Sequence, residues 1–340
     1  MTDNAVERED AGVVTATVDW IPILLVAVVV LGALPLVGSV STWVTLTVAA
    51  LAMGMMIFIM ASGLTLVFGL MDVINFGHGV FISVGAYVSL LVLWPLAGWV
   101  DSPSVLLNVL VLLLCIALSM IVSGVFGWAF ERVIIRPVYG QHLKQILVTM
   151  GGLIVVEQLL YALFGGNPIT ISLPQSFRGG FAFGPDVVVE RYRLIAVGVG
   201  LVVFVGMMLV LNRTRIGLLV RAGVENPEMV EALGYRIRRL FIGVFVAGSA
   251  LAGLGGVMWG FYQQTLTVGM GLQVLVLIFI VVIIGGLGSI GGCLIGSLLV
   301  ALLANYTAFL EPKIALVSNI ALMLAILLWR PQGLYPVVRV

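Results

Sequence analysis

The chain has 340 residues, of which 62% are hydrophobic and 9% charged, and its mean hydropathy is +1.24. Soluble domains carry about 25% charged residues, so this composition excludes a soluble globular protein. The formal net charge of +1 gives no indication of a nucleic-acid partner. The apolar runs are continuous over roughly 20 residues and do not alternate, which predicts membrane-spanning helices rather than a β-barrel.

Taken in chain order, the apolar runs predict an all-α polytopic membrane protein with about ten transmembrane helices and glycine-rich helix breaks. The predicted spans are about 20–40, 44–69, 80–94, 105–130, 146–164, 194–211, 241–262, 272–284, 293–310 and 314–329. Residues 1–19 are polar and acid-rich, which predicts a tail rather than a signal peptide. The membrane domain is expected over 20–330, with a second tail over 331–340. Cys115 and Cys293 lie inside apolar runs, match no metal or disulfide pattern, and are interpreted as packing residues.

The second and third spans are separated by a polar interruption within the stretch GLTLVFGLMDVINFGHGVFIS, residues 63–83. Its polar and glycine positions are Asp72, Asn75, Gly77, His78 and Gly79. Polar backbone at membrane depth persists only where protein or a water-filled cavity surrounds it, and ionisable groups there indicate function. We therefore interpret the stretch as a helix break on or beside a substrate path. The alternatives are that Asn75 and His78 satisfy backbone groups freed by the break, and that Asp72 ends a helix at the cytoplasmic edge.

A second glycine-rich break, Gly285–Gly292, follows the eighth predicted span and contains Ser289. Interrupted hydrophobic segments in corresponding halves point to the substrate path in transporters, so the two breaks suggest an internal repeat, although their sequence identity is weak. Either break can also be a re-entrant turn. Ser289 is a candidate for the path or a turn element. Glu157, inside the fifth span, is a candidate for the path or for a helix interface.

The most basic segment, residues 212–240, is expected to be cytoplasmic because arginine and lysine concentrate on that side of a membrane. Its six arginines are Arg213, Arg215, Arg221, Arg236, Arg238 and Arg239. With ten spans, this orientation also places both termini in the cytoplasm.

Within this segment, the sequence ENPEMVEALGY predicts a two-turn helix with its own start and stop signals. Asn226 is a suitable N-cap, Pro227 fits the first helical position, Glu228 favours the positive end of the helix dipole and Gly234 can end the helix. The apolar residues expected on one side are Met229, Val230 and Leu233. A helix this short must dock on something, and the residues alone leave two partners open: membrane lipid headgroups or a cytoplasmic protein that it couples to the membrane domain.

Four segments resemble LivH-type permeases, the membrane subunits of ABC importers for branched-chain amino acids. They are GLTLVFGLMDVINFGHGVFISVGAYVS, RTRIGLLVRAGVENPEMVEALGY, GGLGSIGGCLIGSLLVALL and LLWRPQGL, and the resemblance covers about residues 44–335. The sequence departs from the family pattern in three places. Asp72 stands where glycine or another small residue is expected, Ile290-Gly291 replaces a proline-containing turn, and the N-terminal tail is longer.

The resemblance implies an ABC importer permease fold in a bacterial or archaeal inner membrane, with 212–240 as the coupling loop. It implies a second homologous permease, two ATPase subunits and an extracytoplasmic substrate-binding protein. The chain has no GxxxxGK[ST] phosphate loop, so it is expected to be no enzyme and to hold no cofactor, with ATP and Mg in the partner subunits. The expected substrate is a branched-chain or other small amino acid; urea or a short amide is the alternative within the family. An ion-coupled transporter using Asp72, His78 and Glu157 is the alternative outside it, and a membrane enzyme or a channel is disfavoured.

Overall fold

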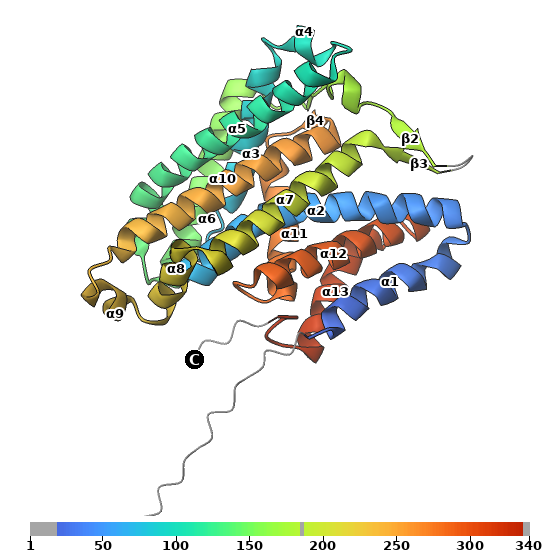
Figure 1. Cartoon of the computed structure of the whole chain (residues 1–340). Coiled ribbons are helices and arrows are strands. Elements are labelled where there is room, and N and C mark those ends of the chain that lie inside the picture. Colours follow the sequence, from blue (N-terminus) through green and yellow to red (C-terminus); the bar gives the residue numbers. More distant parts are fainter. Residues whose placement is uncertain (1–18, 184–186, 336–340) are drawn as a thin grey trace, which may run out of the picture.

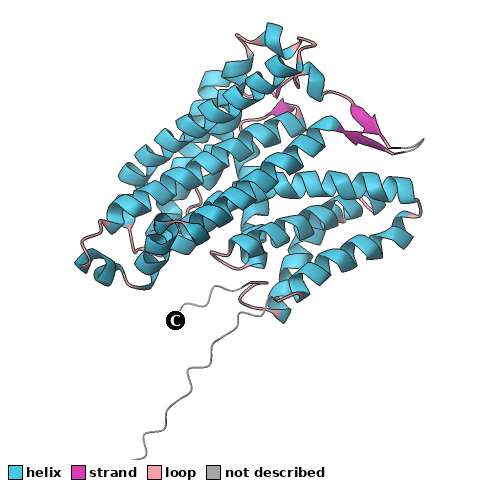
Figure 2. Ribbon diagram, viewed as in Figure 1, coloured by secondary structure: helices cyan, strands magenta, loops and turns pink. Residues whose placement is uncertain are grey.

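The computed structural model describes residues 19–183 and 187–335, and these form a bundle of helices with two very small sheets (Figures 1 and 2). The predicted tails therefore lie largely outside the described residues, at 1–18 and 336–340. The helices are α1 (Ile21–Val37), α2 (Val40–Met71), α3 (His78–Leu93), α4 (Ala97–Val100), α5 (Val105–Phe130), α6 (His142–Phe164), α7 (Arg191–Arg213), α8 (Arg215–Glu225), α9 (Pro227–Ala232), α10 (Ile237–Gln263), α11 (Met270–Gly285), α12 (Ile290–Leu310) and α13 (Ala315–Trp329).

The strands lie together at one end of the bundle, between helices. β1 (Ile169–Thr170) pairs antiparallel with β4 (Thr265–Leu266), and β2 (Gly180–Ala182) pairs antiparallel with β3 (Val188–Glu190). A π-helical turn, Glu131–Ile135, continues α5, and short 3₁₀ turns follow at Arg136–Val138 and Gln175–Phe177. The fold is thus all-α in its membrane part, as predicted.

Among the described residues, six helices are long and apolar enough to cross a membrane: α2, α5 with its π-helical continuation, α6, α7, α10 and α12. Four apolar helices are shorter, at Ile21–Val37, His78–Leu93, Met270–Gly285 and Val317–Trp329. By length and composition, the described residues thus show six full-length spans, fewer than the ten predicted. α3 begins directly after the first break, and α11 ends at the second; each has 16 residues. At 1.5 Å per residue these helices extend about 24 Å, less than the ~30 Å hydrocarbon core.

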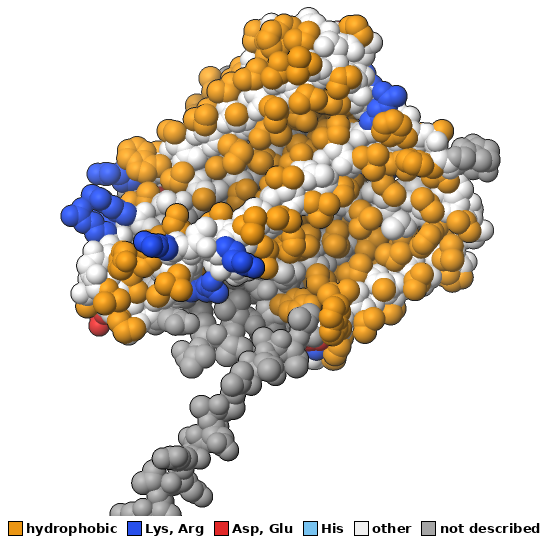
Figure 3. Space-filling view, in the orientation of Figure 1, with side chains coloured by type: hydrophobic (Ala, Val, Ile, Leu, Met, Phe, Trp, Pro, Cys, Tyr) orange, Lys and Arg blue, Asp and Glu red, His pale blue; other side chains and the backbone are white. Residues whose placement is uncertain are grey.

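The centre of the bundle is built from α2 and α10. In the most apolar part of each helix, 61% of the residues of α2 and 56% of those of α10 are buried, against 17% in α7. α2 packs against α10, α12 and α7, while α10 also packs against α3 and α5. The outer helices consequently present apolar side chains on the surface, which Figure 3 shows as a broad hydrophobic face, as expected for contact with lipid.

Glycine lets the central helices approach backbone to backbone. A methyl group added at Gly63 in α2 would overlap the carbonyl oxygen of Gly248 in α10, and one at Gly85 in α3 would overlap the backbone of Gly253 in α10. Helices in membranes gain little from the hydrophobic effect between themselves and associate through such close packing of small residues. This accounts for part of the chain's high glycine content, 41 of 340 residues.

The two chain ends within the described range are tied to one another. Arg330 donates to the Asp19 carboxylate at 2.5 Å, and the Tyr335 hydroxyl donates to the Asp19 carbonyl oxygen at 2.7 Å. The Arg330 side chain, together with a hydrogen bond from the Ile21 amide, lowers the pKa of Asp19. The entry to α1 and the exit from α13 are thus held side by side.

We predict that Gly69→Ala destabilises the protein, because a Cβ at residue 69 of α2 would lie 2.5 Å from the Cα of Gly288 in the second break. Such overpacking typically costs about 1–3 kcal/mol. Gly291→Ala, in the first turn of α12, is the matched control because nothing lies within 4 Å of its added Cβ. Thermal unfolding in detergent should show a lower midpoint for the first variant only; equal midpoints would contradict the close contact of the two breaks.

Candidate functional site

The first break begins where α2 ends, at Met71. Asp72 takes a left-handed conformation with φ of 52°, and its amide bonds the Phe68 carbonyl at 3.0 Å. Glycine is the usual residue in this conformation, and aspartate is among the few others that tolerate it. The helix-ending geometry therefore explains why a small residue is expected at position 72. The Asp72 carboxylate is half exposed and lies 3.8 Å from Nε2 of His142, so the structure places Asp72 at a helix end.

Side chains from α6 and the turn before it satisfy the backbone of the break. Gln145 accepts from the Ile74 amide at 3.4 Å, Thr149 accepts from the Phe76 amide at 3.1 Å, and the Tyr139 hydroxyl donates to the Met71 carbonyl at 3.0 Å. Sequence reasoning missed these three residues. Gln145 and Thr149 are four residues apart at the start of an apolar helix, and that spacing puts them on one face, which was an available signal.

His78, the first residue of α3, is buried, and its Nε2 lies 2.9 Å from the Met60 carbonyl oxygen of α2. Its ring also meets the Phe81 ring edge-on. This arrangement supports the interpretation in which the histidine satisfies a helix backbone beside the break. Gly77 and Gly79 serve close packing, since an added Cβ would meet the Phe130 ring and the Gly271 backbone respectively.

Asn75 differs from its neighbours in the break. Its side chain is fully buried, and neither Oδ1 nor Nδ2 has a hydrogen-bond partner among the described residues. Burying a carboxamide without partners is costly, so a purely structural role does not account for this residue. Among the predicted path residues, Asn75 is the one whose buried polar atoms have no hydrogen-bond partner among the described residues.

The second break holds α11 and α12 together and rests on the chain's C-terminal segment. Ser289 is the N-cap of α12 and accepts from the Gly292 amide at 3.1 Å, which makes it a turn element. The amides of Leu334 and Tyr335 donate to the carbonyls of Ile284 and Gly285 at 2.8 and 3.1 Å. The segment after α13 therefore pairs carbonyl groups that the end of α11 leaves free.

Glu157 lies beside the start of α3 rather than within a break. It sits on α6, partly buried, and lines a small cavity with Ser83 of α3 and Val268 near the start of α11. Asn75, Gly77, His78 and Gly79 lie in or directly after the first break, Ser289 lies in the second break, and Glu157 lies on α6. The roles of all these residues in transport stay predictions.

The short helix between α8 and α10 forms as the sequence predicts. The Asn226 side chain accepts from the Met229 amide at 2.9 Å, Pro227 begins α9, Glu228 lies in its first turn, and Gly234 has φ of 85° after its end. Its apolar residues do not share one environment. Val230 is buried, whereas Met229 and Leu233 are 58% and 71% exposed. Leu233 is the C-cap rather than a residue within the helix.

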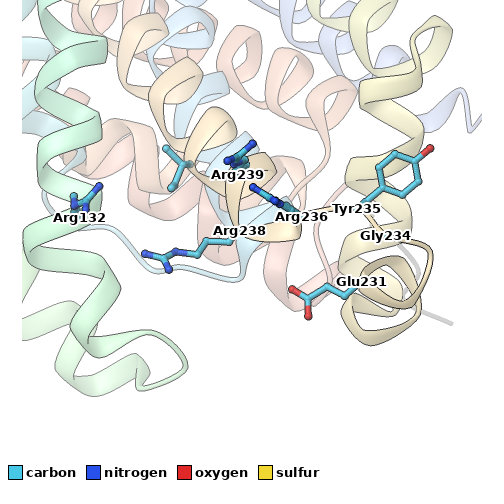
Figure 4. Close-up of a pocket in the computed structure, with 8 residues that line it drawn as sticks. Arg132, Glu231, Gly234, Tyr235, Arg236, Arg238 and Arg239 are labelled. Carbon is cyan, nitrogen blue, oxygen red and sulfur yellow. The ribbon is translucent and has the colours of Figure 1, made fainter.

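Beside α9 lies a hollow of about 560 Å³ that sequence reasoning did not anticipate (Figure 4). It is lined by Arg236, Arg238 and Arg239 from the start of α10, Glu231 from α9 and Arg132 from the turn after α5. Three arginines at a helix N-terminus face the positive end of its dipole, an unfavourable placement. Among the described residues no carboxylate lies within ion-pair distance of these four arginines. The hollow and the exposed part of α9 together form a basic surface with two apolar side chains.

Comparison with known proteins identifies the fold's family. The family model described as "Branched-chain amino acid transport system / permease component" matches residues 46–328. The chain belongs to this family. The membership confirms the resemblance seen in the sequence, and it agrees with the prediction that the chain is a transport subunit rather than an enzyme.

Two relatives cover most of the chain, and a third covers half of it. The high-affinity branched-chain amino acid transport system permease protein BraD of Pseudomonas aeruginosa is 29% identical over 293 residues, 84% of this chain and 94% of the relative. The corresponding LivH of Escherichia coli K12 is 26% identical over 287 residues, 81% and 90% of the two chains. The nucleoside ABC transporter permease protein NupB of Lactococcus lactis is 28% identical over 186 residues, 50% of each chain. No solved structure matches the permease.

We predict opposite stability effects for the two polar residues of the first break. His78→Leu should lower the thermal unfolding midpoint, because the Met60 carbonyl loses its buried partner, a loss of about 1–3 kcal/mol. Asn75→Leu should leave the midpoint unchanged or raise it, because it removes a buried amide that has no partner.

The Asn75→Leu variant also tests whether Asn75 belongs to the path. Asn75→Leu should reduce solute uptake by the assembled transporter although the protein remains stable. Normal uptake by a stable Asn75→Leu variant would show that residue 75 makes no contact with the solute.

Proposed function

We propose that the chain is the permease subunit of an ATP-driven ABC importer and forms the translocation path for a branched-chain or other small amino acid. The observation that carries this proposal is the family match over residues 46–328, since it covers every long helix of the bundle except the first part of α2. BraD and LivH are named as permeases of branched-chain amino acid systems, which supports the same substrate class here. Urea or a short amide is the alternative within the family.

The proposal includes ten membrane crossings, made by the six long helices together with α1, α3, α11 and α13. The short helices can cross if the bilayer thins locally or if the polar breaks complete the span, as in the discontinuous helices of transporters. We place α8, α9 and both termini in the cytoplasm of a bacterial or archaeal inner membrane. The basic side chains that gather at that end of the bundle in Figure 3 support this orientation.

In this account α9 transmits the movement of the ATPase subunits to the membrane domain. Met229 on α9 and Leu233 at its C-cap are exposed, and Val230 anchors this short helix on the bundle. A helix of this length cannot be stable alone. The partners are two ATPase subunits on the cytoplasmic face, which hold ATP and Mg, a homologous second permease, and a substrate-binding protein at the opposite end. Membrane lipid covers the outer helices.

The geometry does not favour the ion-coupled alternative. A proton relay through Asp72, His78 and Glu157 requires these groups to communicate inside the membrane. The Asp72 carboxylate is half exposed at a helix end, and His78 Nε2 bonds to a helix carbonyl. Glu157 lies on α6 and lines a small cavity whose lining includes neither Asp72 nor His78.

The coupling role predicts the effect of changing the two exposed apolar residues of α9. The double variant Met229→Asp/Leu233→Asp should lose ATP-driven uptake at least tenfold while the permease stays in the membrane, because charges at the centre of a docking contact leave buried unpaired groups in the complex. The volume-conserving control Met229→Leu/Leu233→Met should transport normally. Uptake is measured in reconstituted vesicles with all partner subunits. Normal uptake by the aspartate variant would contradict a role for α9 in coupling.

A further inference from the structure

A groove of about 440 Å³ lies between α2, α11, α12 and α13. Figure 1 shows the arrangement of these helices, in which α12 packs against α2, α11 and α13. It is open on one side and mostly apolar. Its polar lining consists of three carboxamide side chains, one from each of the last three helices: Gln273, Asn305 and Asn319. None of the described residues that line this groove is ionisable.

The carboxamides lie inside the helices rather than in the turns. Gln273 is three residues after α11 begins, Asn305 five residues before α12 ends, and Asn319 four residues after α13 begins. At 1.5 Å per residue these positions are about 5–8 Å from the helix ends. All three helix ends are at the end of the bundle where α10 finishes, opposite to α9. The groove is therefore a mouth of the bundle on the face away from the basic surface.

The environment of Asn319 indicates that the groove receives a ligand. Its side chain is 93% buried, since 7% of it is exposed, and its Oδ1 has no hydrogen-bond partner among the described residues. Nearby, Asn305 is positioned by hydrogen bonds from its Nδ2 to the Ala301 carbonyl at 2.9 Å and the Met53 sulfur at 3.3 Å. Placing a carboxamide against lipid is costly. The part of the groove lined by Asn305 and Asn319 is therefore expected to hold water or a polar solute.

We propose that this groove is the entrance of the solute path and binds a zwitterionic amino acid with an aliphatic side chain. The inference rests on the proposed transport function and adds its substrate contacts. A carboxamide oxygen accepts from an ammonium group and a carboxamide nitrogen donates to a carboxylate, so uncharged carboxamides suit a ligand with both charges. Val276, Leu277 and Ile280 of α11 supply an apolar wall for the side chain. The volume is within the range of small-molecule sites, about 300–1,000 Å³.

Cysteine labelling tests whether the groove is wet and occupied by the solute. Asn305→Cys is made in a Cys115→Ala/Cys293→Ala background, whose native thiols are both buried. The complete transporter, in vesicles with its binding protein, is treated with a membrane-impermeant thiol reagent. We expect labelling of residue 305 that slows at least threefold with saturating leucine. Leu324→Cys, on an exposed apolar face of α13 outside the groove, is the matched control and should stay unlabelled in lipid.

Two other labelling results would overturn the inference. If residue 305 is unlabelled, the groove is closed by lipid or by a second subunit and is no entrance. If residue 305 is labelled equally with and without leucine, the groove is wet but does not bind the solute.

Transport by substituted proteins separates this inference from the proposed function. Gln273→Leu and Asn319→Leu should each lower leucine uptake about tenfold at a fixed subsaturating concentration, the usual effect of losing one hydrogen bond to a charged group. Their ATPase activity with the ATPase subunits should remain. Gln273 is exposed, so its replacement does not threaten folding, and Thr307→Val is the control for a polar group of α12 outside the groove.

Wild-type uptake decides which idea has failed. If the wild-type transporter shows no ATP-driven uptake, the proposed function is wrong. If the wild type transports leucine and both groove variants equal it, the function stands and the groove inference is overturned.

Discussion

The structure depends on one constraint: inside a membrane, backbone polar groups have no water to bond, so each must find a partner within the protein. The chain breaks its helices twice, and both breaks meet this requirement with groups from elsewhere. Gln145 and Thr149 of α6 hold the backbone between α2 and α3, and the amides of Leu334 and Tyr335 pair the end of α11. The breaks are therefore stabilised parts of the fold. Most polar side chains near the first break hydrogen-bond to its backbone or to a neighbouring helix, and Asn75 has no hydrogen-bond partner among the described residues.

Close approach of glycines joins these supported breaks into one unit. Gly69 of α2 meets Gly288 of the second break, and Gly79 of α3 meets Gly271 of α11. We infer that a movement at one break is felt at the other, because no side chain separates the two backbones at Gly69 and Gly288. An alternating-access transporter needs this kind of connection between its moving parts. The basic surface at α9 and the carboxamide groove lie at opposite ends of the helices so connected.

The sequence predicted the helical membrane fold, the positions of both breaks and the start and stop of α9, because these follow from local signals: apolar runs, glycine clusters and caps. It overestimated the number of full-length spans, since hydropathy does not show where a break shortens a helix. The spacing of Gln145 and Thr149 indicated a shared polar face, but not that this face bonds the backbone of the first break. Nothing in the sequence indicated that Arg132 lies beside α9 or that Asn319 lines a groove, because both sites bring together residues from distant parts of the chain. The different environments of His78 and Asn75, three residues apart, could be seen only in the structure. His78 bonds to the Met60 carbonyl, whereas the Asn75 side chain has no hydrogen-bond partner among the described residues.

We propose that ATP hydrolysis in partner subunits drives solute through this permease. The most direct measurement is uptake of labelled leucine into vesicles that contain the purified complex with its binding protein, with ATP supplied or withheld and with an uncoupler present. If import is driven by ATP, uptake should require ATP and should be insensitive to the uncoupler. Uptake that persists without ATP and collapses when the proton gradient is removed would contradict it.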